Sequence, residues 1–267
     1  MKKQFKLGII GCSPMACNIL KGAVLSDYLH EKKIVVSGVS EKNFEELSYL
    51  GVRMADEDTD VAANCEYLLL ACGRKYFEEN IAGKISHTKV ISIIPNLRKN
   101  TVKNAFGANA VRVARCALNM PCEIGSGVVG IDMSDFNCVT DDIEFISGLF
   151  NCVGTVLSVD ESKLDGVSAL GVDGTAYTLM FIDSLIDAGV KHGLTKNEAK
   201  ILAVQTMIGT AELVEREEQS VSDLLLRACV KGGTAIEAVK VLEEKDMRNI
   251  LAEAVSACVK KAKELTL

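Results

Sequence analysis

The sequence predicts an α/β protein with a mainly parallel sheet in its N-terminal part and only helices in its C-terminal part. Two observations carry this prediction. Short apolar runs of strand length alternate with helical stretches up to about residue 160, which is typical of a doubly wound sheet covered by helices on both faces. Beyond that point apolar residues recur at helical spacing without another strand-like run. We therefore expect two domains, residues 1–160 and residues 161–267.

The first expected strand is an apolar run at residues 6–10 that ends at a glycine. The other expected strands are apolar runs between turn residues. They are residues 34–37, 67–71, 90–94, 110–114, 127–131 and 155–159. The helices expected between the strands are residues 14–24, 43–50, 61–64, 76–82, 97–106 and 141–149.

The C-terminal part begins with a long apolar stretch at residues 164–194, in which almost no helical face is fully polar. A helix that is apolar on nearly all sides belongs in the interior of a protein, so we interpret this stretch as a buried packing helix. A capping box, Thr195-x-x-Glu198, predicts the start of the next helix. The last helices are expected at residues 222–228, 234–244 and 247–265.

The overall composition is that of an ordinary globular protein, with 48% hydrophobic and 25% charged residues. A formal net charge of −6 gives no electrostatic reason to expect nucleic acid or an anionic membrane. No uninterrupted apolar run approaches the roughly 18 residues of a membrane-spanning helix. The apolar run before Gly11 is too short for a signal peptide. We expect a soluble, cytoplasmic protein.

Ten cysteines and three histidines raise the question of a metal site, which their spacing answers. No C-x-x-C pair occurs, and none of His30, His87 and His192 has a cysteine or another histidine close to it in sequence. We assign no metal. The cysteines are interpreted as small apolar residues in a reducing compartment, and nothing in their spacing supports a catalytic one.

The turn after the first expected strand reads Gly11-x-Ser13-x-x-Ala16. A strand, a glycine turn and a helix are the setting in which G-x-G-x-x-G/A binds the pyrophosphate of a dinucleotide at the helix N-terminus. Ser13 replaces the second glycine, and its hydroxyl either hydrogen-bonds a phosphate or obstructs it. Pro14 suits the first helical turn but has no N–H to donate. The turn predicts a Rossmann-type nicotinamide-dinucleotide site, and the alternative is a purely structural turn.

The C-terminal part also carries a familiar combination of residues. Leu164 and Asp165 precede the run Ser168-Ala-Leu-Gly-Val-Asp-Gly-Thr-Ala-Tyr177, and Asp187-Ala-Gly-Val190 and Gly193-Leu194 follow. These residues resemble the signature of pyrroline-5-carboxylate reductase, which normally reads T-A-L-S-G-S-G-P-A-Y. That family makes proline by reducing a cyclic imine with a nicotinamide cofactor. The resemblance covers nearly the whole chain and implies a homodimer, or a higher homo-oligomer, that forms through the C-terminal helices.

The resemblance also implies a cofactor site. Residues 70–74, Leu-Ala-Cys-Gly-Arg, stand where the family has L-A-V-K-P, and residues 115–121 stand where it has R-x-M-P-N-T-P. Arg74 either replaces the lost cation or is a surface charge, and Asn119 either faces the nicotinamide or is a turn residue ahead of Pro121. The implied cofactor-binding residues are Gly11, Ser13, Pro14, Met15, Ser40, Ala71, Gly73, Arg74 and Asn119.

The choice between the two nicotinamide cofactors depends on the end of the second strand, where acidic residues favour NAD, and basic and hydroxyl residues favour NADP. Residues 40–42 are Ser-Glu-Lys, which is mixed, so we expect NADP or NAD with a slight preference for NADP.

A substrate site is implied at Lys231-Gly-Gly-Thr234, where the family has S-P-G-G-T/A-T and holds the substrate carboxylate. Backbone amides at a helix N-terminus and the charge of Lys231 suit that task, and the alternative is a glycine-rich helix entry without a ligand. Asp173 stands at a serine position, where it either grips a cationic or amino-bearing substrate or caps a helix. The implied substrate-binding residues are Asp173, Gly174, Lys231, Gly232, Gly233 and Thr234.

The leading functional expectation is the reduction of L-1-pyrroline-5-carboxylate to L-proline by hydride transfer from NAD(P)H. No acid–base residue is assigned, because a protonated C=N carbon is already electrophilic and needs mainly positioning. One alternative is a reductase for a different imine or keto acid on the same scaffold. The other is a non-catalytic, cofactor-binding or regulatory paralogue.

Overall fold

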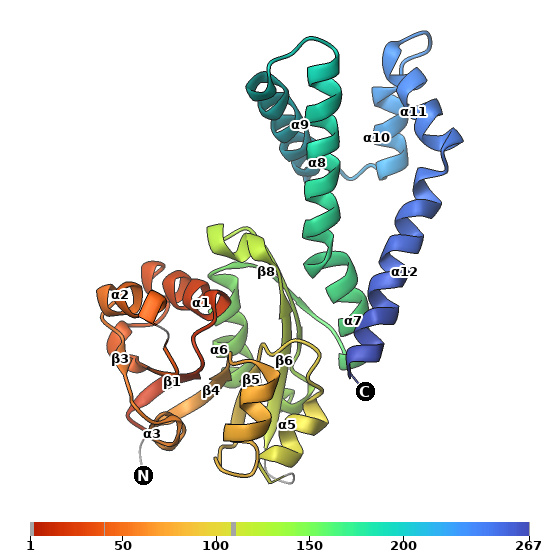
Figure 1. The fold of residues 1–267 in the computed structure, drawn as a ribbon. Coiled ribbons are helices and arrows are strands. Elements are labelled where there is room, and N and C mark those ends of the chain that lie inside the picture. The colour runs from red at the N-terminus through yellow and green to blue at the C-terminus, as the bar shows by residue number, and fades with distance from the viewer. Residues whose placement is uncertain (1–2, 40, 108–110, 267) are drawn as a thin grey trace. The chain divides into compact units, whose positions relative to one another are not determined.

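The computed structural model describes residues 3–39, 41–107 and 111–266, which form two compact units (Figure 1). The first unit comprises Met1–Asp173 together with Cys258–Leu267, and the second comprises Gly174–Ala257. The first unit contains an eight-stranded sheet in the order β3-β2-β1-β4-β5-β6-β7-β8. Its strands are β1 (Phe5–Ile10), β2 (Ile34–Ser37), β3 (Arg53–Met54), β4 (Cys65–Leu70), β5 (Lys89–Ser92), β6 (Arg112–Leu118), β7 (Gly127–Asp132) and β8 (Gly154–Ser158).

Neighbouring strands run parallel except β6 and β7, which pair antiparallel with Arg115 opposite Asp132. The prediction of a mainly parallel, doubly wound sheet is therefore confirmed. The predicted strands recur within a few residues of their expected bounds, and the start of the run at 110–114 lies partly outside the described residues. Strand β3 was not predicted, because two residues are too short to show an alternating pattern.

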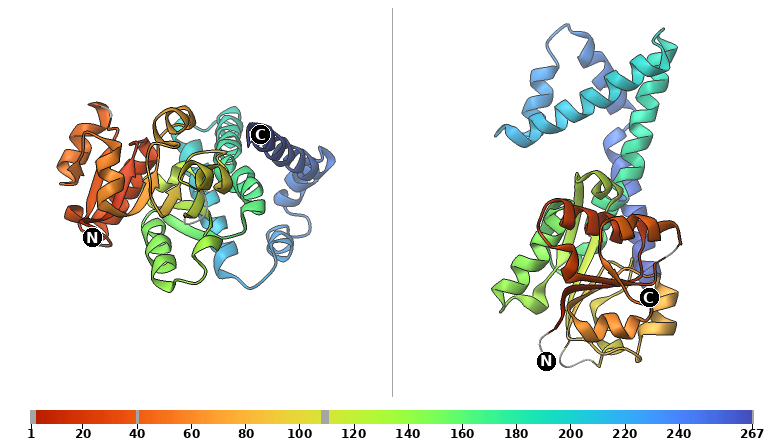
Figure 2. Two further views of the ribbon diagram at one scale, coloured as in Figure 1. Left: turned by 90° about the horizontal axis from the view of Figure 1, so that it is seen from below. Right: turned by 90° about the vertical axis from the view of Figure 1, so that its left-hand side faces the viewer.

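Helices cover both faces of the sheet (Figure 2, right). They are α1 (Pro14–Leu25), α2 (Glu41–Tyr49), α3 (Asp58–Asn64), α4 (Arg74–Tyr76), α5 (Lys99–Ala105) and α6 (Thr140–Asn151). One buried cluster joins α1 and α6 to alternate strand residues such as Leu7 and Ile9. The other joins α3 and α5 to the intervening residues such as Leu68 and Leu70. Alternation along each strand thus supplies two apolar layers from one sheet.

A buried ion cluster attaches α6 to the starts of several strands. Asp142, in the first turn of α6 and 1% exposed, accepts a hydrogen bond from the Tyr67 hydroxyl and pairs with Lys89 Nζ and Arg112 Nη1, each at 2.7 Å. Burial by itself raises the pKa of the Asp142 carboxyl, but the hydrogen bonds from Lys89 and Tyr67 outweigh it, and the pKa lies below its ordinary value. Asp142 is therefore ionised in the folded protein at neutral pH.

The chain leaves β8 through three short helical turns that belong to the first unit. They are η5 (Glu161–Lys163), α7 (Leu164–Val167) and the π-helical turn η6 (Ser168–Val172). The helices that follow are α8 (Gly174–Lys191), α9 (Lys196–Arg216), α10 (Val221–Ala228), α11 (Thr234–Glu244) and α12 (Met247–Thr266), whose last residues return to the first unit. The predicted capping box is confirmed: Thr195 Oγ1 accepts from Glu198 N, and the Glu198 carboxylate accepts from Thr195 N.

The interpretation of residues 164–194 as a buried helix is wrong for the single chain. Within the second unit, α8 contacts α9 through a small buried cluster of Ile186, Ala199 and Ala203. Other apolar side chains of α8 are exposed, including Met180 at 72% and Leu179 at 50%. Two packed helices cover only one stripe of each other, so a helix that is apolar on several sides keeps the remaining stripes uncovered.

The expectation about membrane-length segments also needs correction. Among the described residues, the helical run Glu161–Lys191 is long and apolar enough to cross a membrane by length and composition alone. Of its apolar 18-residue window, 17% is buried. The expectation considered uninterrupted apolar runs, whereas an 18-residue window can reach a mean hydropathy of 1.2 while containing small and a few charged residues. A helix that packs against another protein surface meets the same criterion.

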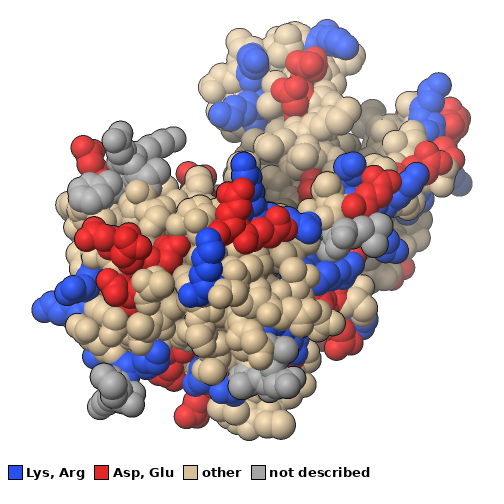
Figure 3. Space-filling model, turned by 60° about the horizontal axis from the view of Figure 1, so that its bottom comes forward, with Lys and Arg blue, Asp and Glu red and all other residues tan. Residues whose placement is uncertain are grey.

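Acidic and basic side chains are interspersed on the face of the molecule shown in Figure 3, with broad uncharged areas between them. Among the described residues, no group of three or more His, Cys, Asp or Glu side chains is arranged to hold a metal ion. All ten cysteines are free thiols: five are buried, including Cys12 and Cys17, and Cys138 is exposed.

Replacing Asp142 with asparagine is expected to lower the free energy of unfolding at neutral pH by about 2 kcal/mol. This is less than the roughly 3–5 kcal/mol of a fully buried pair, because Lys89 keeps its ion pair with Glu66. The pKa of Asp142 in the folded state lies below its pKa in the unfolded state. Its contribution to the free energy of unfolding is therefore fully present above the unfolded-state pKa and is lost as pH falls through the folded-state pKa. Urea unfolding at equal protein concentration, at pH 7 and near pH 3, should show a gap between wild type and variant that shrinks in acid. Equal urea midpoints at pH 7 would contradict this account.

Candidate functional site

The β1–α1 turn lies over the carboxyl ends of three parallel strands. Gly11 N donates to Ser37 O of β2 at 3.1 Å, and Ala71 N, just after β4, donates to Ile10 O at 2.9 Å. Gly11 has a φ of +82°, and a Cβ built on it would lie 2.6 Å from backbone atoms of Cys72. Only glycine fits this turn without strain, as expected where a backbone must pass close to a ligand or to another strand.

Ser13 and Pro14 shape the N-terminus of α1. Ser13 is the N-cap, and its Oγ accepts from Ala16 N at 3.3 Å, while Pro14 occupies the first helical position. The first four N–H groups of a helix have no intrahelical partner. Here Ala16 N donates to Ser13 Oγ and Pro14 has no N–H, so the Ser13 and Met15 amides and the Ser13 hydroxyl proton are the donors that the first turn offers to an anion.

The loop after β4 brings Ala71 beside the turn, whereas Arg74 is engaged elsewhere. Gly73 is the N-cap of α4, and a Cβ built on it meets nothing within 4 Å. Arg74 Nε pairs with Glu78 Oε1 at 2.9 Å, and Arg74 Nη1 donates to Leu265 O, near the end of α12, at 2.9 Å. The guanidinium therefore caps the C-terminus of α12, where a cation is favourable.

Asp58 was not singled out from the sequence, yet it lies at the same edge of the sheet. Its carboxylate accepts from Ser37 Oγ at 2.6 Å and from the Tyr76 hydroxyl at 2.8 Å. This hydrogen bond is the largest cause that raises the pKa of Tyr76 to about 12. Three separate segments meet here, and no local pattern in any of them signals the contact. Ser40, predicted to contact the cofactor, lies outside the described residues.

Asn119 holds three segments together at the end of β6. Its side chain is 7% exposed, its Nδ2 donates to Gly171 O at 3.0 Å, and its Oδ1 accepts from Val128 N at 2.9 Å. It starts the short helical turn η3 (Met120–Ile124), which packs against α1. Asn119 is thus a turn residue, as one alternative held, and also a buried bridge between the sheet and η6.

The family-like run at residues 168–177 begins in a π-helical turn, a feature that is frequent at functional sites. Asp173 follows it with φ −69° and ψ −26° and is exposed. The N-cap alternative for Asp173 is wrong, because an N-cap residue has an extended backbone whereas Asp173 is helical. Burial raises the pKa of the Cys258 thiol, and the nearby negative charge of Asp173 raises it further.

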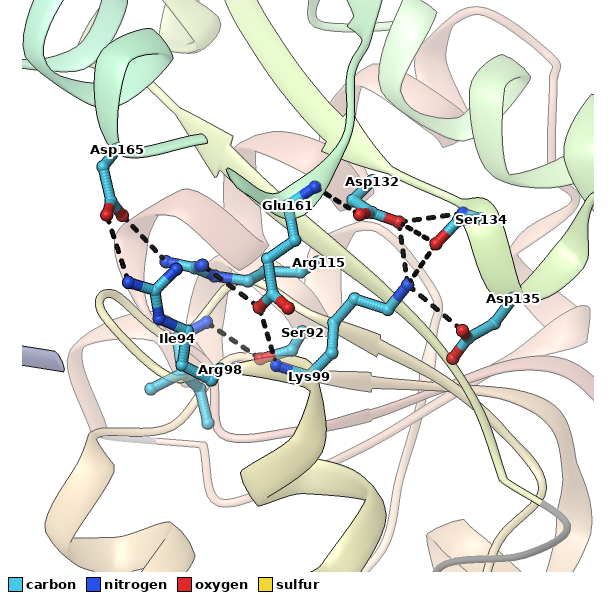
Figure 4. Close-up of polar contacts among 10 residues, drawn as sticks. All are labelled: Ser92, Ile94, Arg98, Lys99, Arg115, Asp132, Ser134, Asp135, Glu161 and Asp165. Atoms are coloured by element: carbon cyan, nitrogen blue, oxygen red, sulfur yellow. Dashed lines mark hydrogen bonds and ion pairs between the residues drawn. The ribbon is translucent and has the colours of Figure 1, made fainter. Parts of the chain in front are cut away.

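An ion network includes Glu161 and Asp165, which precede this segment in the chain (Figure 4). The side chains of Arg98, Lys99 and Arg115 face four acids. These acids are Asp132, Asp135, Glu161 and Asp165. Burial by itself raises the pKa of Asp132, but hydrogen bonds from Lys99 and Ser134 outweigh it and the pKa lies below its ordinary value.

The implied carboxylate loop lies in the second unit. Gly232 has a φ of +79°, Gly233 is the N-cap of α11, and Gly233 N donates to Val230 O at 2.9 Å. Gly233 has no side chain to cap the helix, so the amides of its first turn are available to an anion. Lys231 and Thr234 are exposed beside them. Gly174, the first residue of this unit, is buried.

Comparison with known proteins identifies the family. A profile of the pyrroline-5-carboxylate reductase dimerisation domain matches residues 161–265. The pyrroline-5-carboxylate reductase of Synechocystis sp. is 30% identical over 98% of this chain and 98% of its own length. The chain belongs to the pyrroline-5-carboxylate reductase family.

Solved structures of the family have the same fold. A pyrroline-5-carboxylate reductase from Coxiella burnetii superposes with a TM-score of 0.88 at 27% identity and covers 99% of each chain. Plasmodium falciparum pyrroline carboxylate reductase with NADP bound superposes with a TM-score of 0.85 at 24% identity and full coverage, which shows the shared fold. The resemblance found in the sequence is confirmed.

Family membership explains the uncovered apolar side chains of α8. The matching profile is that of a dimerisation domain, so the helices from residue 161 onward belong to a homo-oligomerising module. Homo-oligomerisation accounts for the apolar side chains of α8 that are exposed in the single chain, because large exposed apolar patches are unfavourable in water.

Replacing Asn119 with alanine is expected to destabilise the protein by about 1–3 kcal/mol, because Val128 N and Gly171 O lose their partner in a buried place. Asn104→Ala is the matched control, since Asn104 is exposed on α5. Urea unfolding at one protein concentration measures both variants. Equal stability of the two would show that water or rearrangement replaces the Asn119 bridge.

Proposed function

We propose that this protein reduces L-1-pyrroline-5-carboxylate to L-proline with a hydride from NADPH or NADH. The observation that carries the proposal is the end-to-end match, at 30% identity, to the pyrroline-5-carboxylate reductase of Synechocystis. Both the sheet unit and the helical unit lie within that match, which covers 98% of the relative's length.

The β1–α1 turn is proposed to bind the cofactor pyrophosphate. The fit rests on Gly11, whose positive φ and contact with the Cys72 backbone leave no room for a side chain. Ser13 and Met15 supply the donors, and Pro14 supplies shape only. Ala71, Gly73 and Asn119 belong to the loops that follow β4 and β6, at the same carboxyl edge of the sheet. Ser40 is retained as a proposed ribose contact.

Arg74 is proposed to contact the cofactor only after it exchanges partners, because it is bound to Glu78 and Leu265 O. Of the two cofactors, NADP remains slightly preferred, and the NADP-bound relative from Plasmodium supports that choice. Asp58, the first residue of α3, accepts a hydrogen bond from Ser37 at the end of β2, which places one negative charge near this edge and favours acceptance of NAD as well.

The substrate carboxylate is proposed to bind the N-terminus of α11, with Lys231 as a point charge and Thr234 as a hydroxyl donor beside Gly232 and Gly233. Asp173 and Gly174 are proposed to contact the remainder of the substrate. A bound nicotinamide would supply the hydride for the imine carbon. The residues of this chain orient the imine and hold its carboxylate, and a protonated C=N group then needs no further acid.

The proposal extends to organisation. The Rossmann-type domain is proposed to comprise residues 1–160 and the dimerisation and substrate domain residues 161–267, with a homodimer or a higher homo-oligomer as the functional state. We also propose that the substrate is a small molecule, that the protein binds neither nucleic acid nor a membrane, and that it is cytoplasmic.

One observation favours a second candidate substrate class. The exposed carboxylate of Asp173 stands at a position that the family fills with serine, and an acid there attracts an amino-bearing imine. A reductase for such an imine is therefore the second proposed function.

The first test is NADPH and NADH oxidation by the purified protein, with and without pyrroline-5-carboxylate, together with cofactor titration by fluorescence. We expect turnover with this imine, because the fold and the cofactor turn are retained. Binding without turnover would favour the second substrate class, and other cyclic imines would then be assayed. Failure to bind either cofactor would overturn the reductase proposal in favour of a non-catalytic paralogue.

Gly11→Ala is expected to weaken NADPH binding at least tenfold, because its Cβ would displace the Cys72 backbone under the turn. Gly83→Ala is the matched control: Gly83 also has a positive φ, +73°, but a Cβ there meets nothing within 4 Å. Both variants carry about 1–2 kcal/mol of backbone strain, so thermal melts compare their stability. Fluorescence titration gives the dissociation constants. Wild-type affinity in Gly11→Ala would remove the turn from the cofactor site.

A further inference from the structure

The helical run that follows β8 is attached to the sheet at two places. The first attachment is the ion network at Glu161 and Asp165. The second is the hydrogen bond from Asn119 Nδ2 to Gly171 O. Arg115 belongs to the first attachment and Asn119 to the second, and both lie on the β6 strand and its immediate continuation. The two attachments therefore fix the position of residues 161–171 along β6.

Glu161 is held by both its backbone and its side chain (Figure 4). Its N–H donates to the Asp132 carboxylate. Its Oε1 accepts from Lys99 N at 2.8 Å and from Arg115 Nη1 at 3.2 Å. Asp132 in turn binds Lys99 Nζ at 2.7 Å. Glu161 is thereby fixed to β6, β7 and the start of α5 at once.

Asp165 completes the attachment one turn later. Its carboxylate accepts from Arg98 Nη2 at 3.1 Å and lies 3.8 Å from Arg115 Nη2. Asp165 and Arg115 are each 5% exposed. A buried charge that loses its partner is strongly unfavourable, so a shift of residues 161–165 along β6 would be costly. Solvated surface pairs would not impose such a constraint.

We propose that Arg115, Glu161 and Asp165 are positioning residues of the reductase site. Their ion pairs hold η6 against Asn119 and so set the geometry of the loop after β6 relative to residues 168–173. The kinetic part of this inference rests on the proposed function, whereas the structural part does not. None of the three residues is proposed to touch the cofactor or the substrate.

The test compares Asp165→Asn with Asp142→Asn. Both aspartates are almost completely buried, and both pair with two cations in the same unit. Asp142 belongs to the α6 cluster and has no link to Asn119 among the contacts of the described residues. Each variant therefore loses a buried carboxylate charge that faces two cations, and only Asp165 lies on the proposed path to the site.

The first readout is amide hydrogen exchange of the intact protein. The Val128 amide is hydrogen-bonded to Asn119 Oδ1, so its exchange reports whether the Asn119 bridge is intact. We expect at least tenfold faster exchange at Val128 in Asp165→Asn than in Asp142→Asn, measured well below both melting temperatures. Equal exchange in the two variants would overturn the inference.

The second readout is kinetic. Asp165→Asn is expected to lower kcat at least tenfold while the dissociation constant of NADPH changes less than about twofold, since small misplacements of reacting groups are costly. Asp142→Asn should keep the wild-type kcat. A loss of kcat that is equal in both variants would reduce the role of Asp165 to stability and overturn the inference.

Glu161→Gln serves if Asp165→Asn does not fold, because the amide oxygen still accepts from Lys99 N while the charge facing Arg115 is lost. Glu161→Gln should also exchange the Val128 amide faster than Asp142→Asn and have a lower kcat. Equal exchange at Val128 in Glu161→Gln and Asp142→Asn would overturn the inference. A wild-type protein without turnover on pyrroline-5-carboxylate would count against the proposed function alone. The exchange comparison would still decide the positioning role.

Discussion

The burial of Lys99 and Arg115 between the sheet and the helical run that follows β8 is the constraint on which the first unit depends. Each cation is 5% exposed, and each is stable there only because carboxylates from other elements reach it. Those carboxylates come from β7, from the turn after β7 and from residues 161–165. Satisfying the charges therefore brings three separate segments to one place and fixes the direction in which the chain leaves the sheet.

The antiparallel pairing of β6 with β7 makes this arrangement possible. It places Asp132 directly opposite Arg115, on the neighbouring strand. A parallel β7 would run in the opposite direction, so its last residue would lie toward the other end of β6 and not opposite Arg115. The same reversal creates the loop in which Asn119 receives Val128 N. The polar network and the Asn119 bridge are thus two consequences of one strand reversal.

The β1–α1 turn, proposed above to bind the cofactor, differs in two residues from the usual dinucleotide motif and still has its strand–turn–helix geometry. Gly11 allows the close approach of the turn to the Cys72 backbone, and α1 begins directly after Ser13. Ser13 replaces backbone flexibility with a capping hydroxyl, and Pro14 replaces an N–H donor with a fixed φ. The helix start is better defined, while fewer amides remain for an anion. This trade favours a turn that is rigid before its ligand arrives.

Local patterns in the sequence determined the α/β class, most strands, the capping box and the position of the glycine turn, because each depends on residues within about ten positions of one another. The same patterns misjudged α8, whose apolar faces are exposed in the chain, and Asp173, which continues a helix instead of capping one. Burial depends on what else covers a face, and a helix start depends on the preceding backbone. The contact of Arg74 with Leu265 O, the Asp58 cluster and the double attachment of residues 161–171 were decided only by the tertiary structure. They join residues far apart in the chain, and the free energy of burying a charge acts only once those residues meet.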